Sequence, residues 1–229
     1  IEGFYGKLLD WESRKLIISA LNKNKMNTYL YAPKEDKNHR FHWRKKYSPQ
    51  WRKSFRDFTN FSKEKKIEII AGIAPGLDFD FNVLKNNPKS SKRSDISLLF
   101  NKAKQLLNDG ASAIALLMDD IQDDFTKIYG KDVSEGSYHG GLANQLSKML
   151  GQSIYFVPRI YADELINDSP KYLLDLSKTL NVDTKIFYCG KDVICKTITN
   201  YSKIHKLFSN KIIYWDNFYA NDYCPRRFF

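Results

Sequence analysis

Short apolar segments rich in β-branched residues alternate along the whole chain with segments whose apolar residues recur every three or four positions. The apolar segments have the length of strands that are buried on both faces, and they are residues 27–31, 67–73, 113–118, 154–157, 184–188 and 212–215. The helical patterns are residues 11–25, 48–65, 94–108, 141–150, 170–180 and 193–208. Parallel strands need crossover connections, so this alternation predicts a parallel sheet covered by helices.

The composition favours one soluble domain. The 229 residues are 42% hydrophobic, enough for one sizeable core, and no linker interrupts the alternation, so we expect residues 1–229 to form a single domain. The net charge of +11 comes from lysines scattered along the helical segments, which favours a solvated surface over a nucleic-acid partner. No apolar run approaches the roughly 20 residues of a membrane span and no targeting motif is visible, so we expect no membrane partner. The three cysteines are odd in number and lack CxxC spacing, which slightly favours a reducing compartment and a cytoplasmic location.

Polar, glycine or proline residues follow nearly every predicted strand. They include Gly3 to Gly6 after a partial first strand, Asp119 and Asp120 after the fourth, and Asp216 with Asn217 after the seventh. Functional residues at the ends of all strands are typical of a barrel, because every loop there opens onto one central pocket, whereas an open sheet concentrates them at one switch point. The sequence therefore predicts an α/β fold, a (β/α)8 TIM-type barrel that lacks part of strand one and the eighth strand.

The most informative motif is an apolar strand that ends in two adjacent carboxylates, Asp119 and Asp120. Two charges so close resist simultaneous ionisation, so we expect one pKa to rise and the other to stay low, a division that suits acid/base catalysis. The alternatives are a helix N-cap, a solvated acidic loop that continues through Asp123 and Asp124, or a metal site. Neither the GxGxxG nor the GxxxxGK[ST] nucleotide-binding motif is present, which weakens the metal-site alternative.

Two further segments carry residue types that bind sugars. Trp215 offers a flat apolar surface for a sugar ring, while Asn217 and Asp222 supply hydrogen-bonding groups for hydroxyls, although a strand followed by an Asn/Asp turn would have the same pattern. Lys34 follows the second predicted strand and is expected to point an ammonium into the pocket. The basic and aromatic residues 39–44 are interpreted as a surface loop, with His39 and His42 in packing or loop roles because they lack metal-ligand spacing.

These motifs together resemble the catalytic domain of family 84 glycoside hydrolases. That family comprises β-N-acetylglucosaminidases and includes protein O-GlcNAcases and bacterial hyaluronidase-like enzymes. The resemblance covers almost the whole chain, and the segments that carry it are residues 2–6, 29–34, 75–78, 117–121, 215–217 and 221–222. It implies a (β/α)8 barrel, retaining hydrolysis of terminal β-linked N-acetylglucosamine, and a glycoprotein or oligosaccharide substrate.

The resemblance also implies a substrate-assisted mechanism, in which the sugar's 2-acetamido oxygen attacks the anomeric carbon and forms an oxazoline. Asp119 would orient and polarise the acetamido N–H, and Asp120 would act as general acid and then general base. The other implied contacts are hydrogen bonds from the Gly3 backbone, Lys34, Asn217 and Asp222, packing of Trp215 on the sugar, and contact of Tyr161 with the acetamido group. No metal and no organic cofactor is implied.

The chain departs from the family pattern at three positions. Arg159 stands where a threonine is common, two residues before Tyr161, and is expected to alter that wall of the pocket. Met118 replaces an aromatic residue and Glu35 an aspartate, which are milder changes. Arg159 and the incomplete barrel favour an alternative function, a catalytically weak or inactive module that binds N-acetylglucosamine. Retention of a proton donor at Asp120 favours the enzyme.

Overall fold

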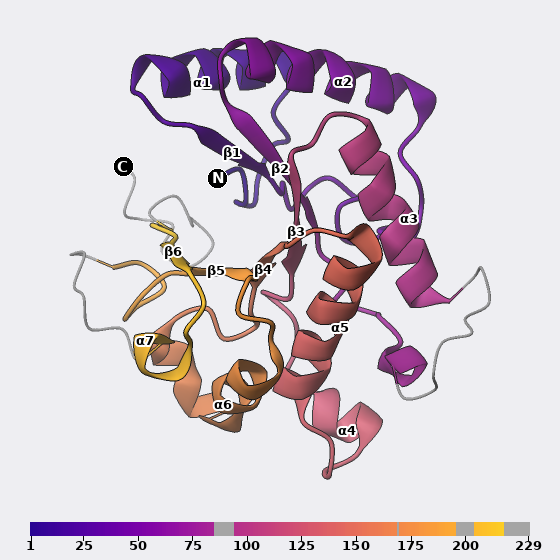
Figure 1. Cartoon of the computed structure of the whole chain (residues 1–229), viewed down its shortest axis with the longest axis vertical. Coiled ribbons are helices and arrows are strands. Elements are labelled where there is room, and N and C mark those ends of the chain that lie inside the picture. Colours follow the sequence, from indigo (N-terminus) through magenta and orange to yellow (C-terminus); the bar gives the residue numbers. More distant parts are fainter. Residues whose placement is uncertain (85–93, 169, 196–203, 218–229) are drawn as a thin grey trace.

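The computed structural model describes residues 1–84, 94–168, 170–195 and 204–217. Its sheet has parallel strands that pair in chain order from β1 to β6. The strands are β1 (Thr28–Tyr31), β2 (Glu68–Ile73), β3 (Ala113–Leu117), β4 (Tyr155–Val157), β5 (Lys185–Tyr188) and β6 (Ile212–Tyr214). All six predicted strands are confirmed, each to within one residue. The sheet curls with helices on its outer side (Figure 1), which confirms the partial barrel.

Seven α-helices lie in the described ranges. They are α1 (Trp11–Lys23), α2 (Pro49–Glu64), α3 (Asp95–Asn108), α4 (Phe125–Tyr129), α5 (Glu135–Leu150), α6 (Pro170–Thr179) and α7 (Ile204–Leu207), with 3-10 turns at Phe81–Leu84 and Asp163–Asp168. The predicted caps hold for the first two helices, because Asp10 accepts the backbone N–H of Ser13 and Ser48 that of Trp51.

Two helix predictions were wrong in their bounds. Helix α5 begins six residues before the predicted position 141, because Ser134 caps it and its early glycines serve packing. A Cβ on Gly136 would lie 2.1 Å from the backbone oxygen of Tyr172, so the glycine allows α6 to approach α5 closely. The helix predicted from 193 is not formed over residues 193–195, and only the short α7 remains of it in the described ranges.

The strands are buried on both faces. In β3, Ile114 and Leu116 pack against the helices, whereas Ala115 and Leu117 face the inside of the curled sheet. Such burial explains the unbroken apolar runs in the sequence, since neither face of a covered parallel strand contacts water. The carboxyl ends of the strands therefore meet at one rim, where the polar residues follow.

A buried ion pair holds the first residues of the chain against the sheet. Glu2 forms a parallel bridge with Tyr31, and its carboxylate accepts two hydrogen bonds from the Arg14 guanidinium, at 2.9 and 2.7 Å, and one of 2.6 Å from the Tyr29 hydroxyl. Both charged side chains are only 2% exposed. The Glu2–Arg14 pair holds the neighbouring Gly3 and Tyr5 at the rim of the sheet. Through this pair, helix α1 supports the rim of the sheet.

We expect Arg14→Met to destabilise the fold by about 3–5 kcal/mol, because it leaves the Glu2 carboxylate buried without its counter-charge. Urea denaturation of the variant and of the double variant Glu2→Gln/Arg14→Met measures the effect. The double variant should recover part of the loss, since it removes the orphaned charge. A single variant within 1 kcal/mol of the parent chain would contradict the assignment.

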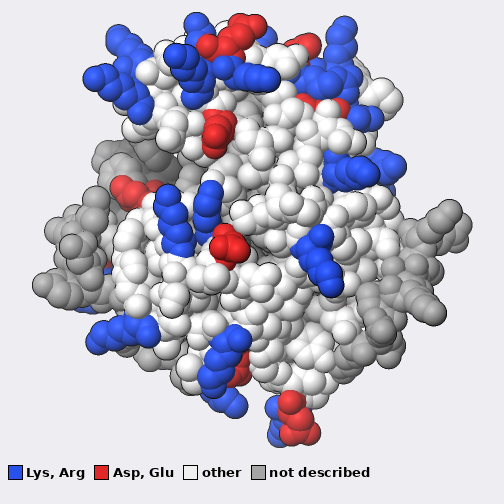
Figure 2. Space-filling model, viewed as in Figure 1, with Lys and Arg blue, Asp and Glu red and all other residues white. Residues whose placement is uncertain are grey.

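The basic residues lie over much of the surface. Figure 2 shows Lys and Arg singly or in small groups on the visible face, most densely over α1 and α2, where Asp and Glu are interspersed. Among the described helices, none is long and apolar enough to cross a membrane.

Candidate active site

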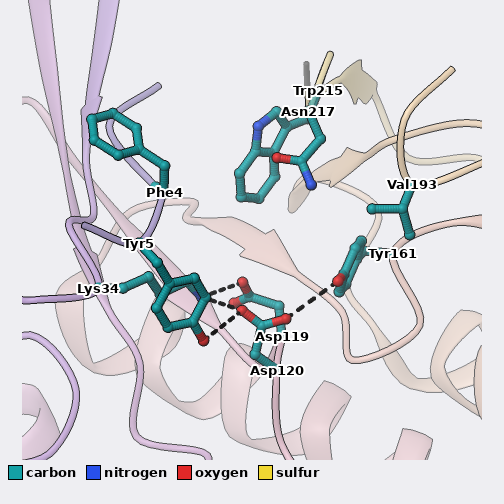
Figure 3. Close-up of a pocket in the computed structure, with 10 residues that line it drawn as sticks. Phe4, Tyr5, Lys34, Asp119, Asp120, Tyr161, Val193, Trp215 and Asn217 are labelled. Atoms are coloured by element: carbon teal, nitrogen blue, oxygen red, sulfur yellow. Dashed lines mark hydrogen bonds and ion pairs between the residues drawn. The ribbon is translucent and has the colours of Figure 1, made fainter. Parts of the chain in front are cut away.

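Residues from five strand ends and from the N-terminal segment line one pocket of about 260 Å³ at the rim of the sheet (Figure 3). Asp119 and Asp120 follow β3, Lys34 follows β1, and Tyr161 follows β4. The rest of the lining is Gly3, Phe4, Tyr5, Val193, Trp215 and Asn217. Seven of the eight residues expected from the sequence are therefore brought together; the eighth, Asp222, lies outside the described residues.

Asp119 has one satisfied and one unsatisfied oxygen. Its Oδ2 accepts a hydrogen bond of 2.5 Å from the Nζ of Lys34, a side chain that is only 2% exposed. Its Oδ1 is buried and has no hydrogen-bond partner in the described part of the chain. A buried carboxylate oxygen without a donor is costly, so this atom is suited to accept an N–H or O–H from a bound ligand.

Asp120 is held by groups on every side. Its carboxylate accepts hydrogen bonds from the hydroxyls of Tyr5, at 3.1 Å, and Tyr161, at 3.2 Å, and lies 3.1 Å from the Lys34 ammonium. Figure 3 shows these contacts converging on the pair of aspartates, with Trp215 and Asn217 across the open space. The backbone of Asp120 has a φ of +56°, the left-handed region that only a few residue types adopt.

Arg40 fixes this backbone. Its Nη2 donates to the carbonyl oxygen of Asp120 at 2.6 Å, and its Nη1 donates to the Tyr5 hydroxyl at 2.6 Å. The interpretation of residues 39–44 as a surface loop was therefore wrong in part, because Arg40, His39 and Trp43 are buried. His39 does have the expected packing role, with Nδ1 2.9 Å from the Gly72 carbonyl oxygen. No separate role was predicted for Tyr5 or Arg40 from the sequence.

The pKa of Asp120 is lowered, whereas a general acid next to a charged carboxylate was expected to have a raised pKa. Burial alone would raise it, but the charge and hydrogen bond of Lys34, with the Tyr5 hydroxyl and the Arg40 charge, lower the pKa below its usual value. Burial likewise disfavours the Lys34 ammonium, yet the two aspartates raise its pKa. The expectation counted two like charges, whereas Lys34 lies between the carboxylates and relieves their repulsion.

Arg159 does not form the wall of the pocket, contrary to expectation. Its guanidinium turns to helix α5 and donates two hydrogen bonds of 2.7 Å to the Glu135 carboxylate, with Asp123 at 3.3 Å. Arg159 is absent from the pocket lining, so its side chain is not part of the pocket surface around Tyr161.

Trp215 packs edge-on against the backbone at the start of the chain. A Cβ on Gly3 would lie 3.0 Å from Cζ2 and 3.2 Å from Cη2 of the indole, so a glycine at this position lets the ring reach the pocket. The described residues contain no group of three or more His, Cys, Asp or Glu side chains placed to hold a metal ion.

A family model described as beta-N-acetylglucosaminidase matches residues 1–229. The chain belongs to the β-N-acetylglucosaminidase family. Curated members that it resembles are the Protein O-GlcNAcases of Rattus norvegicus and Mus musculus, each 32% identical over 239 residues, which cover all of this chain and 25% of the relative. The chain thus spans about a quarter of the length of these relatives. The family resemblance inferred from the motifs is confirmed.

Solved structures agree with this membership. The structure of CpGH84B matches with a TM-score of 0.82 and 28% identity, over 97% of this chain and 39% of that one. An O-GlcNAc hydrolase mutant from Thermobaculum terrenum matches with a TM-score of 0.82 and 23% identity, over 96% of this chain and 47% of that one, and supports the fold alone. The β-N-acetylglucosaminidase domain therefore has its family's fold over the described strands.

Proposed function

We propose that this domain hydrolyses terminal β-linked N-acetylglucosamine with retention, using the substrate's own acetamido group as nucleophile. The observation that carries the proposal is the unsatisfied, buried Oδ1 of Asp119 in a pocket that also holds a tryptophan and a second carboxylate. The 2-acetamido group has an N–H for that oxygen and a carbonyl oxygen that is able to attack the anomeric carbon. A plain hexose can offer that oxygen a hydroxyl, but it has no carbonyl oxygen able to attack the anomeric carbon.

The proposed reaction has two balanced steps. In the first, the acetamido oxygen bonds to C1 as the C1–O bond to the leaving group breaks, while Asp120 gives its proton to the leaving oxygen and Asp119 accepts the acetamido N–H. In the second, Asp120 takes a proton from water, whose oxygen bonds to C1 as the oxazoline ring opens. The hydroxyl replaces the leaving group on the same face, so configuration is retained.

The remaining lining residues are proposed to hold the sugar. Trp215 packs on the apolar face of the ring, as indole rings do on flat apolar surfaces, and Tyr161 contacts the acetamido group. Lys34, Asn217 and the Gly3 backbone supply hydrogen bonds to the ring hydroxyls. With about 260 Å³, the pocket is slightly smaller than the roughly 300–1,000 Å³ typical of ligand sites, which favours one sugar ring.

Sugar binding is expected to raise the pKa of Asp120. Its side chain is 26% exposed in the empty pocket, and a bound ring would remove that water and strengthen the burial that disfavours the charged form. The alkaline limb of the pH profile should therefore lie at higher pH for kcat, which reports the complex, than for kcat/KM, which reports the free enzyme. Full profiles with an aryl substrate measure both limbs; coincident limbs, or the reverse order, would contradict this account of Asp120.

The proposal is tested by hydrolysis of an aryl β-N-acetylglucosaminide by the 1–229 chain. We expect turnover with release of the β-anomer as the first product, which NMR detects before the anomers equilibrate. The lowered pKa of Asp120 in the empty pocket favours the second candidate, a sugar-binding module without catalysis. Saturable binding of N-acetylglucosamine by a folded chain that shows no turnover would decide for that candidate.

A further inference from the structure

A second cavity, of about 560 Å³, lies beside the sugar pocket and shares Asp120 with it. Its walls come from the loop after β2, residues 76–81, and from the segment that follows Asp120 as far as Tyr129, with Glu135 and His139 of α5. We call this cavity the acidic groove. Asp120 is the proposed proton donor to the leaving oxygen. The group attached to that oxygen therefore lies next to the surface beyond Asp120, which is the acidic groove.

The groove carries two carboxylates that the described residues do not neutralise. Asp78 pairs with Arg44 and Glu135 with Arg159, but Asp80 and Asp124, one on each wall, have no ion-pair partner within the described ranges. Asp80 accepts the backbone and side-chain N–H groups of the nearby Asn82. On a chain with a net charge of +11, two uncompensated carboxylates in one cavity give it a local charge opposite to that of the protein.

The groove also has an apolar surface. Phe79, Phe81 and Phe125 are buried and line it, while the lining residues Leu77 and Ile128 remain 43% and 63% exposed. An apolar lining with a few carboxylates suits amino-acid side chains better than a second sugar ring, which carries no positive charge and needs many hydrogen-bonding groups.

We propose that the acidic groove binds the polypeptide on the leaving-group side of the glycosidic bond, with a lysine or arginine of that polypeptide against Asp80 and Asp124. This inference rests on the proposed function and specifies its substrate as a glycosylated peptide with a basic residue near the sugar. The peptide's apolar side chains contact Leu77 and Ile128.

The test compares three substrates of the 1–229 chain: a Ser-linked N-acetylglucosamine peptide with lysine near the sugar, the same peptide with glutamate in place of lysine, and an aryl N-acetylglucosaminide. We expect kcat/KM to favour the lysine peptide by roughly 3- to 10-fold over the glutamate peptide, as partly exposed charge pairs do. In the variant Asp80→Asn/Asp124→Asn the preference should vanish while turnover of the aryl substrate stays unchanged. Asp57→Asn, which removes an exposed carboxylate on α2 outside the groove, is the matched control and should keep the preference.

The failures of the two proposals are distinguishable. A lysine preference that survives in Asp80→Asn/Asp124→Asn, or faster cleavage of a chitin-type disaccharide than of either peptide, would overturn the groove assignment while leaving the hydrolase in place. If the aryl substrate is not turned over, calorimetry with the unglycosylated lysine and glutamate peptides still tests the groove. Equal binding of the two peptides would then overturn it.

Discussion

Asp120→Asn is expected to slow the hydrolysis of substrates with poor leaving groups by roughly 100- to 10,000-fold, the range typical of general acid catalysis. The asparagine keeps the shape of the side chain, and its one oxygen can still accept a hydrogen bond from Tyr5 or from Tyr161, but it has no acidic proton to give to the leaving oxygen. A leaving group that departs readily as an anion needs that proton less, so the loss should be far smaller for an activated aryl glycoside.

The measurement is kcat/KM for a series of aryl glycosides of increasing leaving-group pKa, in the parent chain and in Asp120→Asn. The slope of the logarithm of the rate against that pKa should be steeper in the variant. Parallel lines, meaning equal losses for good and poor leaving groups, would refute the role of Asp120 as general acid. Thermal unfolding of both proteins checks that the variant is as stably folded as the parent chain.

Asp119→Asn is expected to reduce the rate for every substrate, by about 100-fold or more, whatever its leaving group. Attack by the acetamido oxygen accompanies the departure of every leaving group, and Asp119 stabilises the positive charge that develops on the acetamido nitrogen. The variant keeps one Lys34 partner, since the Lys34 ammonium is also 3.1 Å from Asp120, so the pocket should stay assembled.

The same series of glycosides measures this effect, and here the slope against leaving-group pKa should match that of the parent chain. A complementary substrate, whose acetamido group carries electron-withdrawing fluorines, should lose less in the variant because its carbonyl oxygen is a poor nucleophile from the start. Rates near those of the parent chain would remove Asp119 from the mechanism. Asp57→Asn serves again as the control for loss of a carboxylate elsewhere.

The strands and the positions of the pocket residues were predictable for a physical reason. A strand covered on both faces must be apolar throughout, so residues such as Ile114 to Leu117 stand out, and polar residues directly after them have to lie at the rim. The start of α5 was not predictable, because Gly136 reads as a helix breaker unless the close approach of α6 is known. Sequence patterns describe one segment at a time, whereas the need for a glycine at this position comes from a different segment, α6.

The electrostatics of the pocket depended on contacts between distant segments. Arg40 binds a backbone carbonyl 80 residues away, and nothing in the sequence around Arg40 indicates that partner. The lowered pKa of Asp120 likewise follows from Lys34, which the sequence placed in the pocket but not between the carboxylates. The residue types and the strand ends predicted which groups lie in the pocket. Which of these groups pair with one another was visible only in the three-dimensional structure.

The Lys34 bridge has a consequence for ligand selection. Lys34 and Arg40 carry two positive charges and Asp119 and Asp120 two negative ones, so the four groups at the base of the pocket sum to zero at neutral pH. Free anions and cations therefore gain little free energy from entering the pocket. Small ions do not compete with an uncharged sugar there. Recognition of the sugar depends on shape and hydrogen-bond direction. Because salt weakens mainly the attraction between exposed charges, it has little effect on this kind of recognition.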